Sequence, residues 1–284
     1  MFPVPPVFYS PRSFSVLHDY LSLRTGIFNY SFSIFNSMRY FAELAYNGTR
    51  YYGWQRQPGQ ISVQETLEQA LSTILGAELE VTGCGRTDTG VHASQYYLHF
   101  DFDGTFPRVF TRRLNKFLPP DIAIHRIFPV APEAHARYDA VRRAYQYHLT
   151  FRKDPFALET AYYFPFPTRP DFSKLQEAAN LLLSYEDFYP FCKSNTDVHT
   201  MKCRLSRAEW EEVSPDRLIF HIAANRFLRG MVRLIVGMSL NVAMSKIPLE
   251  EVRQAMDRQI RLKRSWSAPP EGLFLSEVRY PFVD

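Results

Sequence analysis

The sequence predicts an α+β protein of two similar halves, each a mainly antiparallel sheet with helices on one face, with an active-site cleft between them. Three observations favour this class. The chain has 284 residues, of which 46% are hydrophobic, so it can bury a large core. Segments with every second residue apolar are interspersed with segments whose apolar residues recur every three or four positions. The order of these strand-like and helix-like segments in the first half is echoed in the second.

The first half opens with a strand and a capped helix. Met38–Tyr46 alternates between apolar and polar residues, as a half-buried strand does. Ser62–Leu75 carries an apolar stripe, and we expect Ser62 to cap it by accepting a hydrogen bond from the amide of Glu65. Gly76 is placed to end this helix. The elements expected next are strands at Leu79–Cys84 and Ser94–Asp101, a helix at Pro107–Leu118, and strands at Asp121–Val130 and Arg142–Phe151.

The second half repeats this order of elements. The expected elements are a helix at Asp171–Leu183, paired strands at Arg204–Glu212 and Asp216–Ala224, and helices at Phe227–Met244 and Leu249–Arg258. The proline-rich segment Tyr163–Pro170 is expected to connect the halves. We expect residues 38–135 to form the N-terminal half, which carries the catalytic loop described below, and residues 136–284 the C-terminal half.

Composition argues against a disulfide-stabilised protein and against a protein that spans a membrane. The 33 basic and 29 acidic residues give a net charge of +4, which is weak evidence for a polyanionic partner. The three cysteines have no CxxC spacing, which favours a reducing compartment, and we expect a cytoplasmic protein. No apolar run approaches the roughly 20 residues that cross a bilayer. Residues 1–37 are rich in proline, serine and aromatics, and we expect a non-native or disordered extension there.

One loop concentrates the chemistry. Gly85-Arg86-Thr87-Asp88-Thr89-Gly90-Val91-His92-Ala93 places a single carboxylate between glycines, with an expected strand on each side. Glycine allows such a loop to turn sharply and a ligand to approach the main chain. An aspartate in this setting is either a turn-former, which is the commoner case, or a catalytic group at the end of a strand. His92 is expected to support the loop.

This loop resembles the catalytic loop of the TruA family of tRNA pseudouridine synthases, which usually has alanine where this chain has Thr89. Further matches run in order from Met38 onwards, over about seven-eighths of the chain. They are Tyr52-Gly53-Trp54-Gln55-Arg56-Gln57, Arg143-x-Tyr145-x-Tyr147, Asn225-x-Phe227-Leu228-x-x-Met231-Val232-Arg233 and Ala268-Pro269-Pro270-x-Gly272-Leu273. The resemblance implies conversion of uridine to pseudouridine at positions 38, 39 and 40 in the anticodon stem-loop of tRNA. It also implies a homodimer, no cofactor and no association with a membrane.

The resemblance suggests roles for three residues, and the need to move the target base out of the stem suggests one for a fourth, Arg86. Asp88 is the expected nucleophile, and Arg233 the cation that keeps its carboxylate ionised. Tyr145 is expected to lie over the target base, where its hydroxyl can help move the C5 proton. Arg86 is expected to fill the gap left by an everted base. Around the start of the helix predicted at Phe227–Met244, three arginines at i, i+3 and i+7 would share one face; they are Arg226, Arg229 and Arg233.

Other interpretations remain open. A non-catalytic RNA-binding protein with an aromatic-bearing sheet and basic edges would have a similar composition. A sugar hydrolase is weaker, because such enzymes need two carboxylates around the scissile bond. Cys192, His199 and Cys203 match no standard metal-ligand spacing. Three basic clusters are expected to bind RNA phosphates: Arg253, Arg258, Arg261, Lys263 and Arg264; Arg112, Arg113 and Lys116; and Arg137, Arg142 and Arg143.

Overall fold

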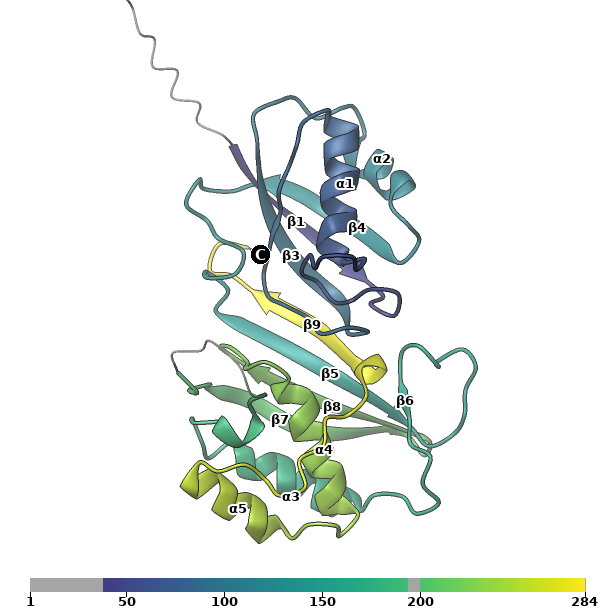
Figure 1. The fold of residues 1–284 in the computed structure, drawn as a ribbon, viewed down its shortest axis with the longest axis vertical. Helices are drawn as coiled ribbons and strands as arrows, with labels where there is room; N and C mark the ends of the chain where they lie inside the picture. Colours follow the sequence, from purple (N-terminus) through teal and green to yellow (C-terminus); the bar gives the residue numbers. More distant parts are fainter. Residues whose placement is uncertain (1–37, 194–199, 284) are drawn as a thin grey trace, which may run out of the picture. The chain divides into compact units, whose positions relative to one another are not determined.

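The computed structural model describes residues 38–193 and 200–283 and contains one mixed arrangement of strands and helices (Figure 1). The strands are β1 (Met38–Tyr46), β2 (Thr82–Gly83), β3 (His92–Phe102), β4 (Ile122–Pro129), β5 (Arg142–Thr150), β6 (Tyr162–Tyr163), β7 (Leu205–Ser214), β8 (Arg217–Ala224) and β9 (Leu273–Arg279). The α-helices are α1 (Val63–Leu75), α2 (Phe110–Phe117), α3 (Phe172–Leu182), α4 (Met231–Ala243) and α5 (Leu249–Arg258). Short 3₁₀ helices lie at Tyr189–Phe191 and Pro270–Gly272.

A single sheet runs through the described residues in the order β4-β1-β3-β9-β5-β8-β7, with β2 beside β3 and β6 beside β5. Its strand pairs are antiparallel except β3 with β9 and β5 with β6. The predicted α+β class with a mainly antiparallel sheet is confirmed. In Figure 1, α1 and α2 lie beside the β1 and β4 end, whereas α3, α4 and α5 lie beside the β7 and β8 end.

Strand β9 joins the two ends of this sheet, and it was missing from the predicted elements. Its Leu273 belongs to the core packed under β5 and β8, whereas Leu275 and Val278 belong to the core under β1 and β3. The halves therefore share one continuous sheet. The connector predicted at Tyr163–Pro170 is wrong, because Phe164 is buried in the same core as Leu149 of β5.

The predicted caps of α1 are confirmed. The Ser62 side chain accepts a hydrogen bond from the amide of Glu65, and Gly76 ends the helix in the left-handed conformation with φ 67°. Two helices begin later than predicted, because the residue before each adopts a positive φ. Val109 precedes α2 with φ 55°, and Gly230 precedes α4 with φ 70°.

The late start of α4 corrects one part of the site prediction. Arg226 and Arg229 lie before the helix, so they do not share a helical face with Arg233. The strand predicted at Leu79–Cys84 is also mostly wrong, because β2 contains only Thr82 and Gly83. Residues 1–37, where an extension was predicted, lie outside the described residues. No helix in the described ranges is long and apolar enough to cross a membrane.

We predict that this fold loses stability in mild acid, and that His99 makes a measurable contribution. His99 is 6% exposed and its Nδ1 accepts a hydrogen bond from the amide of Ala136 at 3.1 Å. Burial lowers the pKa of His99 to about 4, so protonation favours the unfolded chain. The stabilising effect is complete above the unfolded pKa of about 6.5 and is lost as the pH falls towards 4.

Urea unfolding at pH 7 and pH 5 measures this contribution. Between these two values the wild type should lose about 2 kcal/mol more than the His99→Asn variant, which keeps a hydrogen-bond acceptor but does not titrate. Because other buried histidines also titrate, only the difference between the two proteins counts. Equal losses in both proteins would show that His99 is not responsible.

Candidate active site

The loop that carries Asp88 lies between β2 and β3 and is held by the segment around Gly53. The amide of Trp54 donates to the Thr87 carbonyl at 3.3 Å, and the amide of Gly90 donates to the Tyr51 carbonyl at 3.3 Å. Gly53 has φ 86°, and a Cβ there would lie 2.3 Å from the Thr87 carbonyl oxygen. Only glycine allows the two main chains to approach this closely. The Tyr52-Gly53-Trp54 motif therefore positions the loop.

Side chains fix the start of the loop. The Tyr96 hydroxyl donates to the carbonyl of Gly85, and the Tyr46 hydroxyl lies 2.9 Å from Thr87 Oγ1. Tyr46 and Tyr96 are both buried core residues. The conformation of the loop therefore depends on the core beneath it.

His92 fixes the end of the loop, as predicted. Its Nδ1 accepts a hydrogen bond from the amide of Gly48 at 3.0 Å, so its proton lies on Nε2, which donates to the Glu271 carbonyl at 3.1 Å. The ring is fully buried, and burial lowers the pKa of His92. A neutral imidazole with both nitrogens bonded is a support for the loop.

Arg143 ties the loop to the other half of the sheet, which the sequence did not indicate. Its guanidinium donates to four carbonyl oxygens, those of Cys84 and Arg137 at 2.7 Å and those of Ala140 and Asn225 at 3.3 Å. Its neighbour Arg142 pairs with Glu277 at 3.0 Å. Other groups of the protein thus already bind the guanidinium groups of these two arginines, which belong to the third predicted phosphate-binding cluster.

Replacing Arg143 by lysine should both destabilise the fold and slow turnover. Lysine keeps the charge, but its single ammonium cannot reach four carbonyl groups in a fixed plane. Buried carbonyls left without a donor should cost about 2–3 kcal/mol in the free energy of unfolding. Denaturant melts and initial rates measure the two effects. Arg108→Lys in the exposed turn before α2 is the matched control, and equal behaviour of both variants would remove Arg143 from this role.

Asp88 meets Arg233 as predicted. Arg233 Nη1 lies 3.2 Å from Asp88 Oδ2, and the two side chains are 14% and 24% exposed. Arg233 is held in turn by Ala268, since its Nε donates to the Ala268 carbonyl at 2.6 Å and its own carbonyl accepts from the Ala268 amide at 3.0 Å. The ion pair thus joins the loop of one half to the first turn of α4 in the other.

A second cation on Asp88 was missed. Lys193 Nζ lies 3.5 Å from the same oxygen, Oδ2, and its side chain is 36% exposed. Lys193 lies in none of the motifs that carried the resemblance, and 105 residues separate it from Asp88 in the chain. Only the fold brings them together, so no local pattern could have found it.

Tyr145 lies on β5, opposite Leu275 of β9 and Ile222 of β8. Its ring packs edge-on against Phe227, with centroids 5.1 Å apart. Burial raises the pKa of the Tyr145 hydroxyl, against a smaller opposing effect of the Arg143 charge. The phenol is therefore protonated at neutral pH. Tyr147 is fully buried and donates to the Pro269 carbonyl at 2.9 Å, as expected of a core residue.

Three other arginines lie around this region without reaching Asp88. Arg86 is exposed and makes no ion pair or hydrogen bond within the described ranges. Arg226 donates to the Thr200 carbonyl at 3.2 Å. The side chain of Arg229 is exposed, and its carbonyl accepts a hydrogen bond from the amide of Lys193 at 3.2 Å. The site is thus built from Asp88, Arg233 and Lys193.

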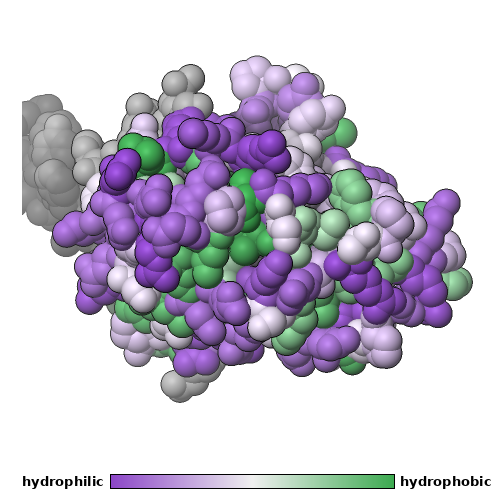
Figure 2. Space-filling model, turned by 90° about the horizontal axis from the view of Figure 1, so that it is seen from below, coloured by the Kyte–Doolittle hydropathy of each residue, from purple (hydrophilic) through white to green (hydrophobic). Residues whose placement is uncertain are grey.

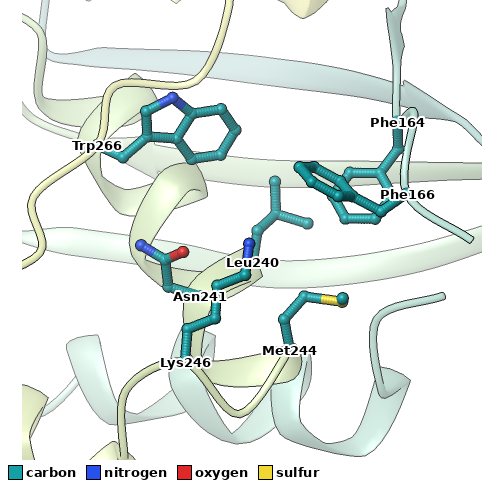
Figure 3. A pocket seen from close by; sticks show the side chains of 7 residues that line it. All are labelled: Phe164, Phe166, Leu240, Asn241, Met244, Lys246 and Trp266. Carbon is teal, nitrogen blue, oxygen red and sulfur yellow. The ribbon is translucent and has the colours of Figure 1, made fainter. Parts of the chain in front are cut away.

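The apolar pocket shown in Figure 3 is separate from this site. Its volume is about 270 Å³, and it lies at the C-terminal end of α4, whereas Arg233 lies in the first turn of that helix. The lining residues are Phe164, Phe166, Leu240, Asn241, Met244, Lys246 and Trp266. Among the described residues, no group of three or more histidines, cysteines and carboxylates could hold a metal ion; His199 lies outside them.

Comparison with known proteins identifies the family. The tRNA pseudouridine synthase family model matches residues 42–139 and 178–281. The chain belongs to this family. The match covers one segment in each half; Asp88 lies in the first and Arg233 and Lys193 lie in the second, whereas Tyr145 lies between them. By family the chain is an isomerase.

Individual relatives agree with this assignment. The chain is 46% identical over 245 residues to tRNA pseudouridine synthase A of Bacteroides fragilis, which covers 86% of this chain and 96% of the relative. It is 45% identical over 249 residues to the protein of the same name from Porphyromonas gingivalis, with 86% and 97% covered. A Geobacillus relative of the same name is 35% identical over 248 residues, with 86% and 99% covered.

Proposed function

We propose that this chain converts uridine to pseudouridine at positions 38, 39 and 40 in the anticodon stem-loop of tRNA, with Asp88 as the nucleophile. The observation that carries the proposal is the Asp88 carboxylate, held in the loop between β2 and β3 by two cations from the other half. Family membership supports tRNA as the substrate. The three positions rest on the sequence resemblance.

The reaction needs no net addition or removal of atoms. In attack at C1′, an Asp88 oxygen forms a bond to C1′ while the N1–C1′ bond breaks, and its electron pair stays with the uracil. The base turns, C5 attacks C1′, and the carboxylate leaves with its own electron pair. C5 then loses its proton and N1 gains one. A carboxylate can serve in this way only when ionised, and Asp88 forms an ion pair with the guanidinium of Arg233.

We assign Tyr145 and Arg86 to the substrate. The Tyr145 ring can stack on an everted uracil, and its protonated hydroxyl can donate a hydrogen bond or pass a proton. Arg86 is exposed at the edge of the Asp88 loop, so its planar guanidinium is available to fill the gap left in the stem. Moving a paired base out of the stem costs a few kcal/mol, and a side chain that occupies the gap lowers that cost.

Two basic clusters suit the RNA backbone. Figure 2 views the molecule from the end that carries α3 and α5, and most of that face is hydrophilic. All five basic residues of the cluster along α5 and after it are exposed, as are Arg112, Arg113 and Lys116 on α2. Such residues neutralise phosphates without reading bases, so affinity for tRNA should fall as salt rises. A protein that recognises the shape of the stem-loop, and not its bases, can act on adjacent uridines in different sequences.

The assembly and location are part of this proposal. We propose a homodimer in the cytoplasm, where tRNA is modified, with the chain divided into halves at residues 38–135 and 136–284. Both the dimer and the division rest on the resemblance and on the order of elements. Sedimentation with and without tRNA measures the assembly directly.

Mapping of the modified bases tests the function. Purified protein is incubated with an unmodified tRNA transcript, and pseudouridines are located by a reagent that blocks reverse transcription at that base. We expect stops at uridines 38, 39 and 40. A non-catalytic RNA-binding protein would retard the tRNA in a gel and leave the map unchanged, and modification confined to other positions would refute the site assignment.

A further inference from the structure

Lys193 reaches Asp88 from a segment that no motif singled out. It follows the short helix at Tyr189–Phe191, and its main chain is fixed by a hydrogen bond from its amide to the Arg229 carbonyl. Its ammonium then lies 3.5 Å from Asp88 Oδ2. Within the described part of the chain, Asp88 is the only ion-pair partner of this ammonium.

The path of the Lys193 side chain crosses Gly230. A Cβ at Gly230 would lie 2.8 Å from Lys193 Cε and 2.9 Å from its Cδ and Cγ. Gly230 also has φ +70°, a conformation that other residues adopt only with strain. A glycine at this position therefore leaves room for the lysine and also starts α4, which carries Arg233.

We propose that Lys193 is a second positioning cation of the site, which holds Asp88 Oδ2 together with Arg233 and supplies the positive charge that stabilises the departing uracil. The proposal rests on the function proposed above. We further infer that Gly230 serves this role by letting the lysine chain pass.

The arrangement of the two cations supports the proposed positioning role of Lys193. Both bind Oδ2, and the other carboxylate oxygen, Oδ1, has no hydrogen-bond partner in the described ranges. The carboxylate is therefore turned so that Oδ1 is left for the substrate. Because Arg233 is also held by Ala268, it anchors the group, whereas Lys193 is the more exposed of the two.

The net charge of Asp88, Arg233 and Lys193 supports the proposed stabilisation of the departing uracil. One carboxylate and two cations carry a net charge of +1. In attack at C1′, and in any route that breaks the N1–C1′ bond, the electron pair of that bond leaves with the base. The extra positive charge is then matched by the uracil anion, and a preorganised charge of this kind lowers the barrier.

Two substitutions of Lys193 test the role. Lys193→Met should lower kcat by about 30- to 100-fold with KM changed less than threefold, because the charge acts on the reaction and not on tRNA binding. Lys193→Arg should restore most of the rate, since it returns a cation to the same place. Unchanged kcat in Lys193→Met would overturn the proposal.

A better leaving group separates charge stabilisation from a merely structural role. Fluorine at C5 withdraws electrons and stabilises the uracil anion without help from the protein. We follow the loss of 5-fluorouridine from a substituted tRNA, by chromatography of the digested nucleosides. Lys193→Met should slow this step about tenfold less than it slows reaction of ordinary uridine. Equal losses on the two substrates would refute the charge role.

Gly230→Ala tests the passage of the lysine chain without removing the ammonium. It should lower kcat like Lys193→Met, and the double variant should lose little more than either single one, because both changes remove one interaction. Gly76→Ala is the matched control: Gly76 has φ +67°, but a Cβ there meets nothing within 4 Å. If the losses of kcat in the two single variants multiply in full in the double variant, Gly230 does not act through Lys193.

The outcomes distinguish this inference from the function on which it rests. If the wild type forms pseudouridine, Asp88→Asn does not, and Lys193→Met turns over normally, only the role of Lys193 fails. If the wild type forms no pseudouridine, or Asp88→Asn remains active, the proposed function itself fails.

Discussion

Replacing Asp88 by asparagine is expected to abolish pseudouridine formation while tRNA binding stays nearly intact. Asparagine has almost the same shape, so the loop held by Trp54 and Arg143 should keep its conformation. Its amide is not a nucleophile, and we expect turnover to fall by at least about 10⁴-fold. The rate is measured by tritium release from tRNA labelled at C5 of uridine, since that position loses its proton.

Binding and a second aspartate provide the controls. The Kd for tRNA, measured by filter binding at fixed salt, should change less than about threefold. Asp103→Asn is the matched substitution, because Asp103 is exposed and follows β3 at the end of that strand opposite to the Asp88 loop. It should leave the rate unchanged. Ordinary turnover in Asp88→Asn would disprove the nucleophile assignment.

Replacing Arg233 by leucine is expected to reduce catalysis by about 10²- to 10³-fold, and tRNA affinity far less. Without its guanidinium, the partly buried Asp88 carboxylate loses its closer counter-charge and the group that fixes its orientation. A carboxylate without this fixed orientation is a poorer nucleophile. Single-turnover rates at saturating enzyme isolate this loss from any change in binding.

Two variants sharpen the interpretation of the Arg233 result. Arg233→Lys keeps the charge but cannot also donate to Ala268 through Nε, so its loss should be smaller than that of leucine. Arg229→Leu removes an exposed arginine near α4 that does not contact Asp88, and its kcat should stay within about twofold. Normal turnover with poor binding in Arg233→Leu would make Arg233 a phosphate contact.

The sequence predicts the parts of this molecule that are local. The α1 helix, its Ser62 cap and its Gly76 end follow from short-range rules, and so do the hairpin of β7 and β8 and most of the remaining strands. The pairing of Asp88 with Arg233 came from motifs of a family resemblance. The structure shows that the two side chains form an ion pair between the halves.

What the sequence missed depends on contacts between distant segments. Strand β9 is short and lies between β3 and β5, so its identity as a strand depends on partners more than 100 residues earlier in the chain. Arg143 lies in a family motif without an assigned role, and Lys193 lies in no motif, so only their partners Cys84 and Asp88 give them roles. The helix pattern also extended α4 too far, because periodicity does not reveal the left-handed conformation of Gly230.

The central claim is that the Asp88 side chain reaches an everted uridine of the anticodon stem-loop. A crystal structure of the Asp88→Asn variant with an unmodified tRNA tests it most directly, because the substrate stays intact. We predict one of the uridines 38–40 outside the stem, its C1′ about 3–3.5 Å from the side chain at position 88 and its base against the Tyr145 ring. A stem-loop with all three uridines still stacked, or an everted base in another part of the protein, would contradict the account.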